Sequence, residues 1–159
     1  MICKGTRIVL SDGSLKDIQD IRAGDILCDG HKVKQVIEHA HGPIDIVNIG
    51  ELRISLWHPI HMGVFWVFPV HQGPTIEIDV NDPAFDIVLE SGHYVWTSND
   101  IKCCTLGHGL TDFVARHKYF GTDKILHDVD QLGPYYKATH LHTLRDSNQE
   151  VYKWIFYTD

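Results

Sequence analysis

Residues with the chemistry of acyl transfer occur at three separate places in the chain. They are a thiol at Cys3, a hydroxyl and an imidazole at Ser55 and His58, and a carboxylate and a second imidazole at Asp86 and His93. A free cysteine has a pKa of about 8.5, so its thiol needs a nearby base to react at neutral pH. An imidazole can protonate a leaving amine. Together these residues predict an acyl-transfer site.

Each residue also has an ordinary structural interpretation. Cys3 fits a buried cysteine at the start of a strand, and His58 fits a half-buried histidine beside Pro59. Asp86 lies on an alternating apolar stretch, where a carboxylate either faces solvent or belongs to a site. His93 follows a glycine and fits a turn residue equally well. The residue types alone leave these alternatives open.

The stretch from Phe85 to Trp96 is predicted to position the acid. Phe85, Ile87 and Leu89 alternate with other residues, a Ser-Gly pair interrupts the run, and residues 94–96 resume it. This pattern is typical of a β-hairpin. Asp86 and His93 would then lie on one hairpin.

The rest of residues 1–106 predicts a series of short strands. Asp12-Gly13 is a hairpin turn signal between strands at 6–10 and 14–18. Further strands are expected at 26–28, 32–39, 44–49, 52–56 and 76–80, with a strand pair or a bent strand within 62–70. Turn signals recur about every 8 to 12 residues, which favours an all-β fold.

Residues 107–159 have a different pattern. Asp112 and Thr122 could cap helices at about 112–116 and 123–132, before strand-like residues return at Tyr135. We expect one domain over residues 1–159, with a β core at about 1–106 and a small α+β extension at about 107–159.

The amino-acid composition argues against several classes of protein. The 43% apolar and 22% charged residues are ordinary for a soluble globular protein. The net charge of −7 and the lack of a Lys/Arg cluster argue against a nucleic-acid partner. No long apolar run predicts a membrane span, and no signal peptide is expected. Four cysteines are too few for a disulfide scaffold, so we expect an intracellular, reducing environment.

Twelve histidines raise the alternative of a metal site. The pairs His39/His41, His58/His61 and His140/His142 have suitable spacing, but no Cys-x-x-Cys accompanies them. We expect scattered histidines, no metal and no cofactor. A metal hydrolase is the least favoured function.

The order of motifs resembles the Hint superfamily, shared by inteins and hedgehog autoprocessing domains. The motifs are Cys3, Leu10-Ser-Asp-Gly13, Ile21-Arg-Ala-Gly-Asp25, Ser55-Leu-Trp-His58-Pro59 and Phe85-Asp-Ile-Val-Leu-Glu-Ser-Gly-His93. The tail, with Thr105-Leu-Gly-His-Gly-Leu110 and Arg116-His-Lys-Tyr-Phe-Gly121, is similar to the Hint domain that accompanies von Willebrand A domains. The resemblance implies a horseshoe-like β fold in which Cys3, Ser55, His58, Asp86 and His93 are catalytic.

The sequence departs from the family in three places. Serine replaces the usual threonine at Ser55. The spacing from Cys3 to the Asp12-Gly13 turn is shorter by about two residues. Cys103 and Cys104 stand where inteins have His-Asn, so full protein splicing is not expected.

The predicted function is autoprocessing by an N-to-S acyl shift at Cys3. The resulting thioester would be resolved by hydrolysis or by transfer to a small nucleophile, and the partner would be the chain's own N-terminal flanking polypeptide. The competing hypothesis is a degenerate Hint fold that acts as a binding or structural module.

Overall fold

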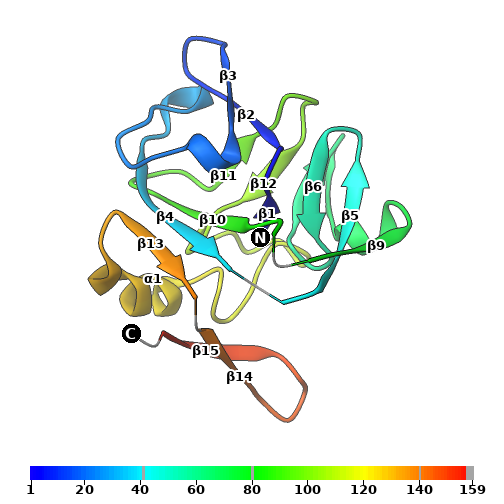
Figure 1. Cartoon of the computed structure of the whole chain (residues 1–159), viewed down its shortest axis with the longest axis vertical. Coiled ribbons are helices and arrows are strands. Elements are labelled where there is room, and N and C mark those ends of the chain that lie inside the picture. The colour runs from blue at the N-terminus through cyan, green and yellow to red at the C-terminus, as the bar shows by residue number, and fades with distance from the viewer. Residues whose placement is uncertain (41, 80, 140, 157–159) are drawn as a thin grey trace.

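A two-residue strand at the N-terminus lies in the middle of the largest sheet. The computed structural model describes residues 1–40, 42–79, 81–139 and 141–156. Within them, seven strands pair in the order β13–β4–β10–β1–β6–β5–β9 (Figure 1). Their bounds are Tyr135–Ala138 (β13), Val33–His39 (β4), Ala84–Leu89 (β10), Ile2–Cys3 (β1), Leu52–Ser55 (β6), Ile44–Ile49 (β5) and Thr75–Ile78 (β9).

Three smaller sheets surround this one. The four-stranded sheet has the order β11–β12–β7–β8, and two hairpins pair β2 with β3 and β14 with β15. The bounds are Tyr94–Trp96 (β11), Lys102–Cys104 (β12), Ile60–Met62 (β7), Phe65–Val67 (β8), Arg7–Val9 (β2), Leu15–Asp17 (β3), Leu141–Arg145 (β14) and Val151–Phe156 (β15). The prediction of an all-β fold is confirmed.

One α-helix, α1 at Asp123–Val129, is present in the described residues, with short 3₁₀ turns at Ile18–Asp20, Cys28–Gly30, Pro69–His71 and Asp130–Leu132. The Thr122 hydroxyl accepts a hydrogen bond from the backbone N–H of Lys124, as expected of an N-cap. None of the described helices has the length and apolarity that crossing a bilayer requires.

Three predicted elements are wrong, and the first two are short. The strand expected at 26–28 is reduced to isolated bridges at Ile26 and Leu27, because a 3₁₀ turn begins at Cys28. The helix expected at 112–116 is a single turn: the Asp112 carboxylate accepts from two backbone N–H groups, but one i→i−4 bond, from Arg116, does not continue.

The hairpin predicted over 85–96 is also absent. β10 pairs with β4 along one edge. On the other edge it pairs with β1 at Ala84 and Phe85, and the Ile87 carbonyl accepts a hydrogen bond from the backbone N–H of Leu106, so β11 does not pair there. The chain turns at Gly92, where φ is 107°, and β11 pairs with β12 in another sheet. Asp86 therefore lies in the main sheet, whereas His93 lies in a bend just before β11 of another sheet.

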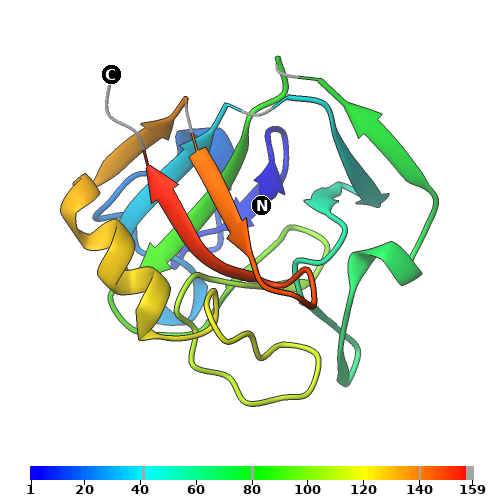
Figure 2. The same cartoon turned by 90° about the horizontal axis from the view of Figure 1, so that it is seen from below.

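β13 links the C-terminal region to the main sheet by pairing in parallel with β4. The β14–β15 hairpin lies beside α1 and β13 (Figures 1 and 2), and β15 contacts α1. The predicted strand at 76–80 includes Val80, which lies outside the described residues.

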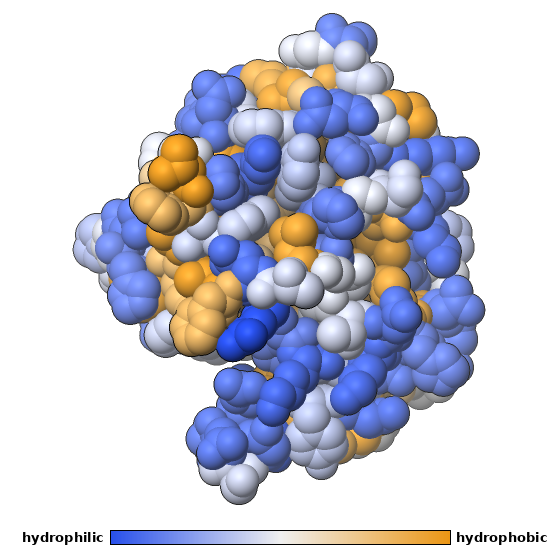
Figure 3. Space-filling model, turned by 180° about the vertical axis from the view of Figure 1, so that it is seen from behind, coloured by the Kyte–Doolittle hydropathy of each residue, from blue (hydrophilic) through white to orange (hydrophobic). Residues whose placement is uncertain are grey.

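The largest core cluster lies on one face of the main sheet. Ile2, Ile54 and Phe85 are neighbours there, and each is at most 2% exposed. Burying a side chain of this size contributes about 1.5–3 kcal/mol, which anchors β1 despite its length. The surface seen from behind has separate hydrophobic patches among hydrophilic side chains (Figure 3).

Candidate functional site

The backbone of residue 1 lies where β6 and β10 flank β1. Ile2 pairs with Phe85 in β10 and with Ile54 in β6. The Met1 carbonyl accepts a 3.0 Å hydrogen bond from the backbone N–H of Ser55, which continues the ladder by one residue. This pairing fixes the nitrogen of Met1 between the ends of the two strands.

A hydroxyl and an imidazole contact that nitrogen. It donates to the Ser55 Oγ at 2.9 Å and lies 2.7 Å from the His58 Nδ1. The other ring nitrogen of His58, Nε2, lies 2.7 Å from the carbonyl oxygen of Cys104. Since a carbonyl only accepts, Nε2 carries the proton, and Nδ1 of the neutral ring is free to accept from the Met1 nitrogen.

A buried carboxylate completes the group. Asp86 Oδ1 lies 3.5 Å from the Met1 nitrogen and 4.0 Å from His58 Nδ1. Asp86 Oδ2 accepts a 2.8 Å hydrogen bond from His39 Nε2. The side chain of Asp86 is 6% exposed, so its charge acts with little screening by water.

Burial and the charge of the Met1 amino group act together on the pKa of His58 and against each other on the pKa of Asp86. Burial lowers the pKa of His58 to about 3, and the positive charge of the Met1 amino group acts in the same direction. Burial alone would raise the pKa of Asp86. The Met1 charge and the His39 hydrogen bond outweigh it, so the pKa of this carboxyl lies below its usual range. The site therefore holds a neutral imidazole beside an ionised carboxylate.

The Cys3 thiol has no hydrogen bond to this group among the described residues, although, besides its burial, the charges of the Met1 amino group and Asp86 act on its pKa. Its side chain is fully buried in a small cluster with Ile46, Ile78 and Ala84, and burial raises the pKa of its thiol to about 11. Cys3 follows Met1 by two residues, so the two side chains point to the same face of the sheet. No hydrogen bond between the described residues joins its sulfur to His58 or Asp86. Its catalytic role stays a prediction.

The other cysteines are unpaired thiols. Burial raises the pKa of Cys103 to about 12 and raises that of Cys104 further. The backbone of Cys104 has a role in the site, since its carbonyl oxygen accepts from His58. Cys28 is the partly exposed thiol of the four.

His93 is exposed and lies just before β11, whose Tyr94 pairs with Cys104 in β12. Its Nδ1 donates to the carbonyl oxygen of His108 at 2.6 Å, and its own carbonyl accepts from the N–H of Thr105. His108 is buried, which lowers its pKa to about 4. No hydrogen bond or ion pair between described residues joins His93 to the Met1 nitrogen, and its role stays a prediction.

Sequence reasoning missed two members of the site, Met1 and His39. The short spacing between Cys3 and Asp12-Gly13 was a signal for Met1, because it indicates that the family's first position lies about two residues upstream. His39 gave no such signal, since it ends an ordinary strand 47 residues from Asp86. From the sequence, His39 is a candidate only for a metal site, and Met1 is not a candidate.

In the described ranges, no three or more His, Cys, Asp or Glu side chains are grouped so that they could hold a metal ion. His41 and His140, two of the histidines considered as ligands, lie outside the described residues.

The fold and the site together define a class: an all-β domain that holds one backbone nitrogen against a hydroxyl, an imidazole and a carboxylate. The model of the Vint family, described as a Hint-domain, matches residues 2–153. The chain therefore belongs to the Vint family of Hint domains, which makes it an autoprocessing-type domain in general terms. No curated protein matches the chain.

Proposed function

We propose that this chain is an autoprocessing domain that cleaves the peptide bond at the nitrogen of residue 1. The convergence of Ser55, His58 and Asp86 on that nitrogen, at 2.9, 2.7 and 3.5 Å, carries the proposal. When a polypeptide precedes Met1, this atom is the amide nitrogen of the bond to be cleaved. The substrate is then the chain's own N-terminal flanking polypeptide.

The reaction needs a proton delivered to the leaving nitrogen. A nucleophile adds to the carbonyl carbon before Met1, the C–N bond breaks, and the Met1 nitrogen takes a proton from His58 Nδ1. Asp86 stabilises the imidazolium and accepts the proton of the nucleophile, while the Ser55 hydroxyl orients the amide. A positioned acid–base group contributes roughly 10²- to 10⁴-fold.

His58 is suited to this role once the flank is attached. In the chain with a free amino terminus, the positive charge of Met1 is one cause of the low pKa of His58. An amide nitrogen carries no charge, so that cause disappears in the precursor and the pKa of His58 rises. Protonation of the ring at neutral pH then becomes easier.

The acyl acceptor is the finer part of the proposal. An N-to-S shift at Cys3 would break the Ile2–Cys3 bond instead of the bond before Met1. The Ile2 carbonyl carbon would move to the Cys3 sulfur as a thioester, the Cys3 nitrogen would take the proton, and water or a small nucleophile would resolve the thioester. The nitrogen of Cys3 lies two residues along β1, about 6.6 Å from the Met1 nitrogen at the usual rise of a strand. A two-residue slip of β1 would bring Cys3 to the site with its side chain on the same face.

A specific observation favours the second candidate, a non-catalytic Hint module. Met1 occupies the position whose nitrogen the site contacts, and its thioether has no proton to lose and forms no stable acyl product. The thiol of Cys3 is fully buried with a pKa of about 11. A domain with an intact acid–base group and no positioned thiol would bind a flank without cleaving it.

We also propose that this chain is related to the Hint domains that accompany von Willebrand A domains. It rests on the tail around Gly107-His-Gly109 and would place a von Willebrand A domain in the flanking polypeptide. Sequencing of the natural transcript would test that arrangement.

Intact-mass analysis of a reporter fused ahead of Met1 tests the proposal. The fusion is incubated with and without dithiothreitol, beside the variants Cys3→Ala, Met1→Cys and His58→Gln. Thiol-dependent release that Cys3→Ala abolishes identifies the Cys3 thioester, and the mass of the product gives the bond that broke. The reporter can instead be released by cleavage before residue 1. If this release persists in Cys3→Ala and is lost in His58→Gln, the acceptor is water or the added thiol.

The same series of fusions distinguishes the non-catalytic module from the autoprocessing domain. In this case the reporter is released only from Met1→Cys, and the double variant Met1→Cys/His58→Gln does not release it. That result shows that the acid–base group works and that this chain lacks the positioned thiol. An unchanged mass in every fusion, including Met1→Cys, would contradict the acid–base assignment itself.

A further inference from the structure

The carboxylate of the site is fixed from behind by a histidine on β4. His39 is 3% exposed, and its Nε2 donates to Asp86 Oδ2 at 2.8 Å. The other oxygen, Oδ1, faces the Met1 nitrogen and His58. Since the two oxygens are rigidly linked, the hydrogen bond to Oδ2 sets the direction of Oδ1 as well.

His39 is itself held by the C-terminal hairpin. The ring of Trp154 in β15 meets the His39 ring edge-on, with centroids 5.2 Å apart and an angle of 70° between the planes. Aromatic pairs prefer this geometry, and it adds about 0.5–1.5 kcal/mol beyond the area buried. Trp154 is 7% exposed and also packs on Phe120 and Phe156.

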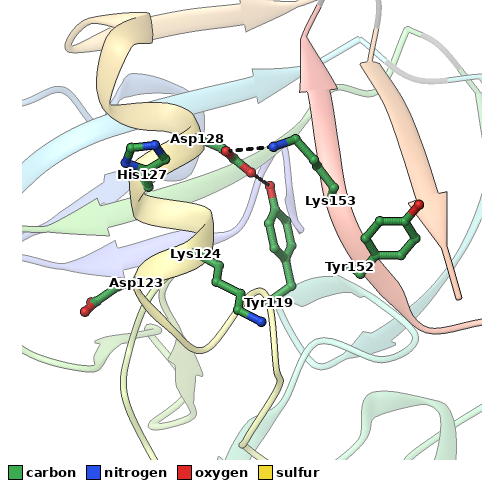
Figure 4. Close-up of a pocket in the computed structure, with 7 residues that line it drawn as sticks. All are labelled: Tyr119, Asp123, Lys124, His127, Asp128, Tyr152 and Lys153. Carbon is green, nitrogen blue, oxygen red and sulfur yellow. Dashed lines mark hydrogen bonds and ion pairs between the residues drawn. The ribbon is translucent and has the colours of Figure 1, made fainter.

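The strand that carries Trp154 is anchored to α1 (Figure 4). The backbone N–H of Trp154 donates to the hydroxyl of Tyr119, which donates to Asp128 on the helix at 2.7 Å. Lys153, next to Trp154, lies 3.4 Å from the same carboxylate. These contacts fix the position of the Trp154 ring relative to β4, because β13 pairs with β4 and α1 precedes β13 in the chain.

We propose that His39 is a positioning residue for Asp86 and that Trp154 of the C-terminal hairpin holds His39 in place. The inference rests on the proposed function for its effect on rate, but the contacts can be tested without it. By this inference, the C-terminal region that carries Trp154 helps to orient the Asp86 carboxylate, which lies in the β core.

The contacts are tested first, by nuclear magnetic resonance of the full chain labelled with ¹⁵N-histidine. The Nε2 proton of His39, buried and bonded to a carboxylate, should exchange slowly and resonate downfield. Trp154→Leu should broaden or remove this signal. Phe156→Leu, a matched control in the same strand and the same cluster, removes a ring that contacts Trp154 but has no ring contact with His39, and it should leave the signal in place.

The effect on rate is tested in whichever reporter fusion releases its flank. His39→Leu should slow release by about 10- to 100-fold, which is the worth of one charge-assisted hydrogen bond. His39→Gln, whose amide can donate from a similar position, should recover most of that loss. Trp154→Leu should slow release by about 2- to 10-fold, and Phe156→Leu should stay at the parent rate.

The outcomes separate the two proposals. An unchanged His39 signal in Trp154→Leu, an equal loss in Phe156→Leu, or a His39→Gln variant as slow as His39→Leu would overturn the positioning inference. If no fusion releases its flank but the His39 signal responds as stated, the proposed function fails and the positioning of Asp86 by His39 and Trp154 stands.

Discussion

Substitution of His58 by glutamine should make the stability of the protein less sensitive to acid. In the folded chain burial lowers the pKa of His58 to about 3, whereas the unfolded value is about 6.5. Between these values the unfolded state binds a proton that the folded state does not, so the free energy of unfolding falls as the pH falls from about 6.5 toward 3. The stability is therefore present near neutral pH and lost in acid.

The size of the effect follows from the two pKa values. At pH 4 the unfolded state gains about 3.3 kcal/mol from protonating this one ring, against about 0.2 kcal/mol at pH 7. The side chain is only 10% exposed, so solvent screens the shift little. Wild type should thus lose about 3 kcal/mol more than His58→Gln between pH 7 and pH 4.

Urea unfolding followed by tryptophan fluorescence, at constant ionic strength and in steps of pH, measures this difference. His108, whose pKa burial lowers to about 4, contributes to both proteins and cancels in the comparison. His142→Gln, at an exposed position on β14, serves as the control and should follow wild type. Parallel curves for wild type and His58→Gln would refute a buried, neutral imidazole in the folded state.

Three further substitutions or reagents test other parts of the structure. Gly107 has a φ of +69°, and a Cβ there would lie 2.4–2.6 Å from the Leu126 side chain. Gly107→Ala should therefore lower the free energy of unfolding by about 2–4 kcal/mol. A loss under ~0.5 kcal/mol in urea unfolding would contradict this. The Thr105 hydroxyl is the buried side-chain polar atom that lacks a hydrogen-bond partner among the described residues. Thr105→Val should therefore leave thermal stability equal or raise it by up to about 1 kcal/mol, and a clear loss would show that the hydroxyl has a partner. Iodoacetamide should modify Cys28 quickly and the three buried thiols only after unfolding, which mass spectrometry over time would show, and fast modification of two or more thiols would argue against the buried positions.

The sequence predicted most strands because turn signals divide residues 1–106 into short segments. It failed over 85–96, where alternation and a Ser-Gly turn look like a hairpin. Alternation of apolar and polar residues shows that a strand has two different faces. It carries no information about which other strand pairs with its edge. β10 has β1 and β4 on its two edges, and one of these partners is more than 80 residues away.

The site was predicted in part for a similar reason. Ser55 and His58 lie in one turn, so their spacing carries information about their geometry. Asp86 was connected to them through the resemblance, and the structure brings it to the same nitrogen. His39 could not be predicted from spacing, because its contact with Asp86 depends on the pairing of β4 with β10. Cys3 is predicted from its chemical reactivity and from the resemblance, and neither gives the position of a strand.

The place of β1 in the sheet has a consequence for the order of events during maturation. β1 is the strand that joins the β13–β4–β10 half of the sheet to the β6–β5–β9 half. The nitrogen of residue 1 therefore reaches the side chains of β6 and β10 only after both halves have closed on it. β13 and Trp154 lie more than 130 residues after β1. The proposed cleavage at this nitrogen would therefore begin only after β13 and β15 have been synthesised and folded, and a nascent chain would keep its N-terminal flank until then.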